Sequence, residues 1–189
     1  WMGASDSARR SVAWEQVAYF LFILYIVSML TRYLNIQKRL PPTQSVFLFG
    51  PRGTGKTSLC QEYLKTTAHS WSVDLLNISL CKKLIRRPSL FREEVESRLP
   101  PPGQVLTVLV DEVQKLPSLL DEVHSLIETH KSRVQFLLTG SSARKLKRGG
   151  ANLLAGRAWT LKLHPLTCLE TPLHLEKALR WGTLPSVYL

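Results

Sequence analysis

The feature that most constrains the fold is a glycine-rich stretch between a short apolar segment and a segment with helical character. Residues 50–57 read Gly-Pro-Arg-Gly-Thr-Gly-Lys-Thr and fit the pattern G-x-x-x-x-G-K-[ST]. Ser45–Phe49 precedes this stretch as a predicted strand, and residues 57–65 follow it as a predicted helix. A strand, a glycine turn and a helix start together aim consecutive backbone N–H groups at one anion. The stretch therefore predicts a phosphate-binding loop.

The residues of this loop have distinct expected roles. The glycines allow backbone angles and a close approach to phosphate that a side chain would prevent. We expect Lys56 to reach the β- and γ-phosphates of a nucleoside triphosphate, the Thr57 hydroxyl to bind Mg²⁺, and Arg52 to face solvent or the nucleotide edge. The flanking strand and helix argue against a chance match. The expected nucleotide-binding residues are Gly50, Pro51, Arg52, Gly53, Thr54, Gly55, Lys56, Thr57 and Ser58.

A second group of polar residues follows a nearly continuous apolar run at residues 105–110. Such a run is typical of a strand buried on both faces of a parallel sheet. We expect this strand to lie beside the one that leads into the phosphate loop, so that Asp111 can bind Mg²⁺ together with Thr57. Glu112 can then polarise the attacking water as the catalytic carboxylate. The alternative is that the two acidic residues only cap the next loop.

The next apolar run, residues 134–138, delivers further candidates. Ser141 is a candidate catalytic contact to the γ-phosphate or the water, with a local serine turn as the alternative. Arg144 and Arg157 are candidates for stabilising transition-state charge, including as an arginine finger that reaches into a neighbouring subunit of a homo-oligomer. For both arginines the alternative is a solvated basic loop.

The order of predicted elements indicates the fold class. Strands and helices alternate with short loops, which implies an α/β fold of three layers, with a mainly parallel five-stranded central sheet and helices on both faces. We expect Ser89 to cap one helix, and Ser118 and Asp121 to form a capping pair at another. The expected strands are 45–49, 71–77, 105–110, 134–138 and 159–163, and the expected helices are 31–40, 57–65, 89–99 and 118–129.

The N-terminal part of the chain is unusual, because residues 17–30 carry no charge. As an apolar helix they would cover about 21 Å, short of a hydrocarbon core of about 30 Å. Residues 11–34 supply the length but include charged residues near both ends. A membrane anchor and an extension that is not native to the domain both remain open. A cleaved signal peptide is disfavoured, since no small-x-small cleavage site follows. We therefore expect an N-terminal segment at 1–30 and a nucleotide-binding domain at 31–189.

The charge and the cysteine content limit the possible binding partners and the cellular compartment of the protein. The net charge is +11, from 25 basic and 14 acidic residues, and no acidic residue lies between Glu128 and Glu170. This field suits nucleic acid or an anionic membrane, contacted through basic residues 144–148, or else it only keeps the chain soluble. The three cysteines are too few and too widely spaced for a disulfide framework or a zinc site. We expect Cys60 and Cys168 to be reduced core residues of a cytoplasmic protein.

Taken together, these motifs resemble a prokaryotic AAA-type ATPase family that is usually followed by a C-terminal domain of unknown function. The resemblance covers about residues 31–189. It implies a P-loop NTPase fold of the AAA-like (ASCE) class, ATP binding and hydrolysis, and a sensor role for residues 139–142. The apolar segment before Met29 departs from the family pattern, and the chain stops about where a helical lid is expected. The motifs that carry the resemblance are residues 50–57, 110–117, 138–146 and 153–157.

Two functions follow from this sequence. The first is an ATPase that uses Mg²⁺ and drives a conformational or remodelling output. The second is a nucleotide-dependent binding switch that recruits nucleic acid or a membrane through its basic face and turns over little. A P-loop kinase is disfavoured, because the Asp111-Glu112 pair is typical of water activation.

Overall fold

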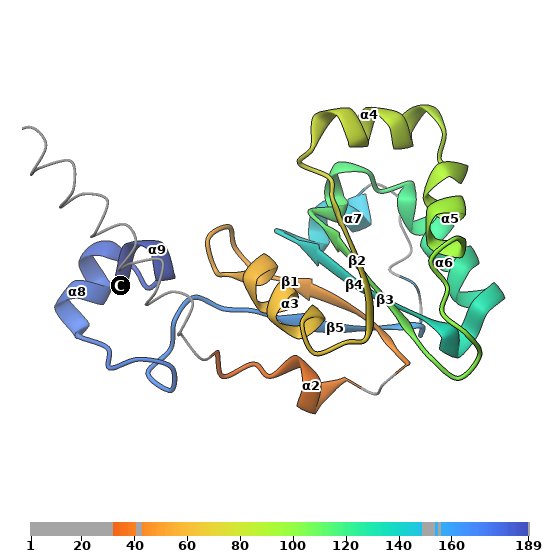
Figure 1. Ribbon diagram of the computed structural model, residues 1–189. Coiled ribbons are helices and arrows are strands. Elements are labelled where there is room, and N and C mark those ends of the chain that lie inside the picture. Colours follow the sequence, from red (N-terminus) through yellow and green to blue (C-terminus); the bar gives the residue numbers. More distant parts are fainter. Residues whose placement is uncertain (1–31, 41–42, 149–153, 155, 189) are drawn as a thin grey trace, which may run out of the picture. The chain divides into compact units, whose positions relative to one another are not determined.

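The computed structural model describes residues 32–40, 43–148, 154 and 156–188 (Figure 1), without the side chains of Lys145, Lys147 and Arg148. The apolar segment expected at residues 1–30 lies outside the described residues. The chain divides into two compact units, one formed by Leu34–Pro165 and one that combines Trp1–Tyr33 with Leu166–Leu189. Within the described ranges, no helix combines the length and the apolar character that crossing a membrane requires.

The larger unit is built around a five-stranded sheet in which all neighbouring strands are parallel, in the order β2-β3-β4-β1-β5. Every residue of β3 and β4 is buried, as their continuous apolar runs predicted. The α/β class and the five-stranded parallel sheet are therefore confirmed. The strands are β1 (Ser45–Phe49), β2 (His69–Asp74), β3 (Leu106–Asp111), β4 (Val134–Gly140) and β5 (Ala158–Lys162).

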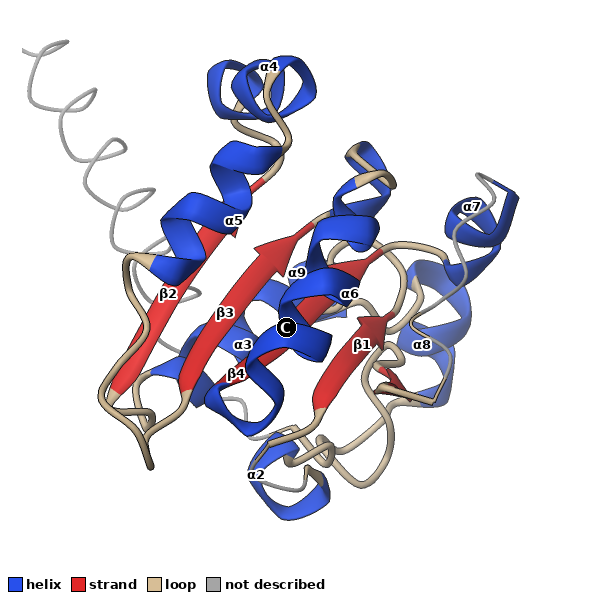
Figure 2. Ribbon diagram, turned by 90° about the vertical axis from the view of Figure 1, so that its right-hand side faces the viewer, coloured by secondary structure: helices blue, strands red, loops and turns tan. Residues whose placement is uncertain are grey.

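Helices cover both faces of this sheet, because alternate strand residues point to opposite sides. Phe47 of β1 and Phe136 of β4 belong to one apolar cluster, which includes residues of α4 (Ile78–Arg86), α5 (Ser89–Glu96) and α6 (Leu119–His130). Val46 and Leu48 of β1 face the other side and pack in a second cluster with residues of α2 (Ile36–Arg39) and α3 (Lys56–Leu64). Figure 2 shows α5 and α6 in front of the strands and α3 behind them. The three-layer arrangement is thus confirmed.

Several helix boundaries differ from the prediction. Ser89 is the first residue of α5 and Pro88 holds the cap position, while Ser118 precedes α6 without a side-chain capping bond. Both cap positions have helical backbone angles, whereas a capping side chain needs an extended backbone. Ser89 is therefore not a cap, and the Ser118–Asp121 capping pair does not form. The predicted helix 31–40 is reduced to α2.

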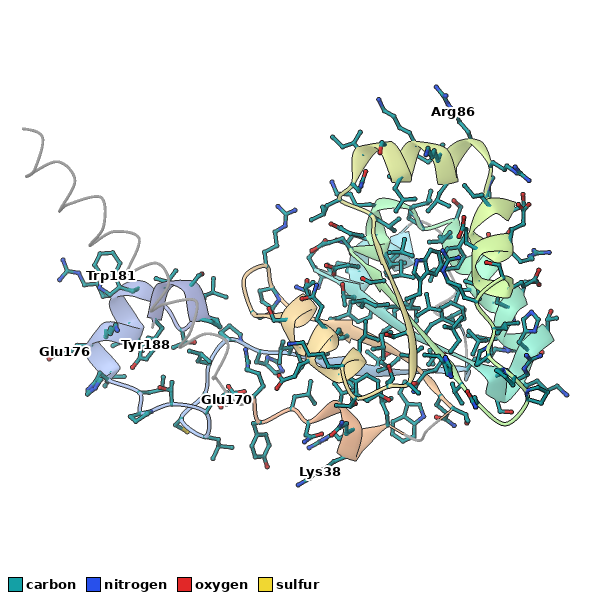
Figure 3. All side chains as sticks on the ribbon, viewed as in Figure 1. Lys38, Arg86, Glu170, Glu176, Trp181 and Tyr188 are labelled. Atoms are coloured by element: carbon teal, nitrogen blue, oxygen red, sulfur yellow. The ribbon has the colours of Figure 1, made fainter. Side chains whose placement is uncertain are left out.

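Some helices of the described residues were not predicted, and α4 is the longest of them. Helix α4 begins after Asn77, whose side-chain oxygen accepts a hydrogen bond from the Leu80 backbone N–H at 3.1 Å. Leu84 is buried against the core, whereas Ile78 and Ile85 are exposed. Arg86 projects outward from this helix (Figure 3).

The second unit contains α8 (Leu175–Trp181) and α9 (Pro185–Tyr188). The Tyr188 hydroxyl accepts from the His174 N–H at 2.6 Å and donates to the Pro172 carbonyl at 3.2 Å. The Arg32 Nε donates to Glu170 Oε1 at 2.8 Å, and both side chains are buried. Cys168 is exposed in a turn, so its predicted core position is wrong, whereas Cys60 is buried as predicted.

Candidate active site

The sheet order determines which loops meet. Because all strands are parallel, the phosphate loop after β1, the acidic pair after β3 and the polar residues after β4 lie at the same edge. Strand β4 separates β1 from β3, so the expectation that Asp111 ends a strand directly beside β1 is wrong. The segment that follows β4 therefore lies between the phosphate loop and the acidic pair.

The phosphate loop is shaped by close approaches that its sequence permits. A side chain at Gly50 would collide with the carbonyl oxygen of Leu163. Gly55 has a φ of 84°, in the left-handed region that favours glycine, directly before α3 begins at Lys56. The Thr54 side chain is buried, and its hydroxyl donates to the Pro51 carbonyl at 2.9 Å. A hydrogen bond within the loop thus stabilises its shape, and α3 begins at Lys56, before the motif ends.

Lys56 is held within the loop. Its Nζ donates to the carbonyl oxygens of Gly50 and Pro51, each at 2.9 Å, and its side chain is buried. Burial lowers the pKa of Lys56 from its ordinary value, while the carboxylates of Glu112 and Asp111 partly offset this effect. A buried ammonium held by neutral carbonyl oxygens is a strong donor for an anionic phosphate.

A chain of hydrogen bonds joins the loop to the two strands beyond it. The Thr57 hydroxyl donates to Asp111 Oδ2 at 2.7 Å, and the Thr139 hydroxyl donates to Asp111 Oδ1. The same Thr139 oxygen accepts from the Glu112 backbone N–H at 3.1 Å. Asp111 is buried, so these two hydroxyls satisfy a charge that is costly to bury alone. The threonine at the end of β4 therefore links Asp111 and Glu112.

Glu112 sits at a sharp turn directly after β3. Its φ of 57° lies in the left-handed region, which costs a non-glycine residue about 1–3 kcal/mol and is frequent at functional sites. Its Oε2 accepts a hydrogen bond from Gln114 Nε2, and the same nitrogen donates to Ser141 Oγ at 3.2 Å. The side chains of Glu112, Gln114 and Ser141 thus form one connected group.

The remaining predicted site residues are placed differently. Pro51, Arg52 and Ser58 are exposed, and Arg144 is exposed on α7 (Ala143–Arg148), which begins shortly after β4. Arg157 precedes β5 at the edge opposite the phosphate loop, where its Nε donates to Glu128 Oε1. It therefore does not join the site of its own chain, and the finger role in a neighbouring subunit stays a prediction.

For two residues of the site, Thr139 and Gln114, the sequence predicted no specific contact. Thr139 was included only in a strand end with an expected sensor role, and Gln114 was part of a motif without a role. A polar residue at the end of a fully buried strand is the signal that points to Thr139. Gln114 gave no such signal, because its approach to Glu112 depends on a 3₁₀ turn, η1 (Val113–Lys115).

Thr57 and Asp111 fit the Mg²⁺ ion that the phosphate-binding motif of residues 50–57 implies. Thr57 and Asp111 offer a hydroxyl and a carboxylate oxygen in contact, and Mg²⁺ prefers oxygen ligands. Cys60, which lies one helical turn after Lys56, is a thiol whose pKa burial raises to about 12, aided by the charge of Asp111. A protonated thiol is a poor ligand, so the oxygen pair suits Mg²⁺ better than this thiol does.

A phosphate loop at the start of a helix, with a carboxylate pair two strands away in a parallel sheet, defines a P-loop nucleotide-binding domain. The family comparison agrees: residues 42–171 match the model of a family described as an AAA domain. The chain therefore belongs to this AAA family, which is a class of P-loop ATPases.

The structure of PCH-2 from C. elegans aligns with a TM-score of 0.48 and 18% sequence identity, over 79% of this chain and 41% of that chain. The chain thus matches less than half of the length of PCH-2. A search of curated proteins gave no significant match.

Proposed function

We propose that this domain hydrolyses ATP with Mg²⁺ and that the reaction drives a conformational or remodelling output. The observation that carries the proposal is the bond chain from the Thr57 hydroxyl through Asp111 and Thr139 to the Glu112 backbone. This chain couples the residue proposed to bind the metal ion to the residue proposed to activate water. Membership of the AAA family supports the same reaction class.

We propose that the phosphates bind at the start of α3. Backbone N–H groups at a helix N-terminus favour an anion there. Among the described residues, the Lys56 ammonium is hydrogen-bonded only to neutral carbonyl oxygens of the loop, and a phosphate oxygen is the stronger acceptor because it is charged. A triphosphate would therefore draw Lys56 away from these carbonyls, and its negative charge would favour the ammonium form that burial disfavours.

Mg²⁺, when bound, would neutralise charge on the β- and γ-phosphate oxygens. We assign its protein ligands as Thr57 and Asp111. The Thr57 hydrogen is already directed at Asp111, so the lone pairs of the hydroxyl oxygen remain available to a cation.

Glu112 is the proposed catalytic carboxylate. Its Oε2 accepts from Gln114, and among the described residues Oε1 has no hydrogen-bond donor. A free carboxylate oxygen beside the phosphate loop is suited to accept a hydrogen from the attacking water. The proposed role of Ser141 is to contact the γ-phosphate or this water from the end of β4.

The test compares steady-state ATP hydrolysis by the wild-type chain, Glu112→Gln and Glu62→Gln. Glu112→Gln removes the carboxylate and should lower turnover about 100-fold or more, while Mg²⁺-dependent binding of ATP persists. Glu62→Gln makes the same chemical change at an exposed position of α3 and should behave as the wild type. A wild-type chain that binds ATP without hydrolysing it would refute the proposal.

The alternative function is a nucleotide-dependent switch that binds nucleic acid or a membrane through residues 144–148. In this segment the described side chain of Arg144 is exposed and has no acidic partner among the described residues. Tight ATP binding without turnover, together with salt-dependent DNA binding that Arg144→Ala weakens, would favour the switch. For the ATPase function, but not for the switch, we propose a homo-oligomer in which Arg157 acts as an arginine finger in the neighbouring subunit. The rate of ATP hydrolysis per chain should then rise with protein concentration.

A further inference from the structure

Gln114 occupies an unusual place between two proposed site residues. It lies in the η1 turn directly after the acidic pair, and its Nε2 carries two hydrogens. One is donated to Glu112 Oε2, and the other is directed at Ser141 Oγ at 3.2 Å. A single amide group thus joins the end of β3 to the end of β4.

The orientation of this amide is fixed by its surroundings. The Gln114 Oε1 is buried, and no donor reaches it within the described part of the chain. It faces Gly140, where an added Cβ would lie 2.8 Å from it. Exchanging the oxygen and the nitrogen would bring Oε1 against the Glu112 carboxylate, which is electrostatically unfavourable. The amino group therefore faces the carboxylate.

This arrangement has a consequence for both partners. Since Gln114 occupies Glu112 Oε2, the other carboxylate oxygen is left for water. Since the Ser141 oxygen accepts from Gln114, the Ser141 hydroxyl must direct its own hydrogen elsewhere. One side chain thus determines how the proposed base and the proposed phosphate contact present their remaining hydrogen-bonding groups.

We propose that Gln114 is a positioning residue for ATP hydrolysis, which fixes the Glu112 carboxylate and orients the Ser141 hydroxyl toward the γ-phosphate. The role rests on the proposed ATPase function and adds a residue that does not itself touch the nucleotide. Gln114 then contributes to the chemical step, because misplacing catalytic groups by about 1 Å can cost about 100-fold in rate. It contributes little to ATP binding.

Two substitutions separate positioning from simple packing. Gln114→Ala removes the amide, and we expect kcat to fall about 10-fold while KM for ATP stays within about twofold. Gln114→Glu keeps the size of the side chain but sets a carboxylate against Glu112, and we expect kcat to fall about 100-fold. A packing role predicts the reverse order, with Gln114→Glu the milder change. Gln61→Glu, the same change at an exposed position of α3, is the matched control and should leave kcat unchanged.

A second measurement does not depend on turnover. In ¹⁵N-labelled wild-type protein, the side-chain amide signals of Gln114 are those missing from the Gln114→Ala spectrum. We expect one of the two proton signals to move when Glu112→Ala removes the acceptor, and the other to move in Ser141→Ala. Signals that stay in place in both variants would overturn the proposal even if every variant hydrolyses ATP.

The two failures are distinguishable. Absence of hydrolysis by the wild-type chain would refute the proposed function, and with it the reaction on which this role rests. Hydrolysis by the wild type, with Gln114→Glu within about threefold of it, would overturn only the role of Gln114.

Discussion

The Thr57 hydroxyl donates to Asp111 Oδ2 at 2.7 Å, although β1, which leads to Thr57, and β3, which ends at Asp111, are not neighbours in the sheet. Thr57 lies in the first turn of α3 after β1, Asp111 ends β3, and β4 runs between these two strands. The bond therefore spans the end of β4 and holds the acidic pair against the phosphate loop. It also fixes the spacing of the two proposed metal ligands.

The first prediction concerns this bond. Thr57→Ala should abolish the gain in ATP affinity on adding Mg²⁺, and should lower the free energy of unfolding by about 1–3 kcal/mol, because buried Asp111 loses a donor. Thr57→Ser keeps the hydroxyl and should retain both properties. ATP titrations with and without Mg²⁺, and urea unfolding, measure the two effects. Equal behaviour of the alanine and serine variants would contradict the assignment of Thr57.

The second prediction concerns the space around Gly140. A Cβ at this position would lie 2.8 Å from Gln114 Oε1 and 3.1 Å from the Phe49 ring. Gly140→Ala should therefore destabilise the domain by about 1–3 kcal/mol, the usual cost of overpacking. Adding Gln114→Ala removes one of the two obstacles and should recover part of that loss. Urea unfolding of the single and double variants completes the cycle, and strictly additive effects would show that the two residues do not collide.

The third prediction concerns the pH dependence of the second unit. Burial acts to raise the pKa of Glu170, but hydrogen bonds from Arg32 and from the backbone N–H groups of Tyr33 and Thr167 outweigh it and hold the pKa below its ordinary value of 4.5. A carboxyl with a lowered pKa stabilises the fold above its ordinary pKa, and loses that contribution as pH falls through the lowered value.

Glu170→Gln should accordingly destabilise the protein by about 1–3 kcal/mol at neutral pH, and the difference should vanish in acid below the lowered pKa. The hydrogen-exchange protection of the Tyr33 and Thr167 amides should fall with it, since both donate to Glu170. Glu176→Gln on α8 changes an exposed carboxylate (Figure 3) and serves as the control. A constant difference between wild type and Glu170→Gln from neutral pH into acid would refute this account.

The sequence predicted the parts of the fold that depend on local pattern. The nearly continuous apolar runs of β3 and β4 are typical of strands buried on both faces. The strand, loop and helix around Lys56 follow from the phosphate-binding motif. Helix α4 was missed although Ile78, Cys81 and Ile85 recur at helical spacing on one face. The Asn77 cap was a further signal in the sequence.

The relationships that were missed depend on tertiary structure. Strand order does not follow from alternation of strands and helices, so β4 was not expected between β1 and β3. The contact of Gln114 with Glu112 requires the reversal of the chain at a left-handed residue, and neither spacing nor composition indicates this turn. Cys168 was expected in the core because its neighbours are apolar, but the segment forms a turn that leaves it exposed.

The position of β1 in the sheet also sets the order in which the chain can fold during synthesis. β2 and β3 pair with each other, whereas β1 pairs only with β4 and β5, which emerge from the ribosome long after it. The phosphate loop depends on these late strands, because the Gly50 N–H donates to Gly140 and the Leu163 N–H donates to Phe49. Although residues 50–57 are made early, their shape is completed only when β4 and β5 arrive, and long-range pairing of this kind is slow. The glycine-rich motif is thus translated long before it can bind a ligand.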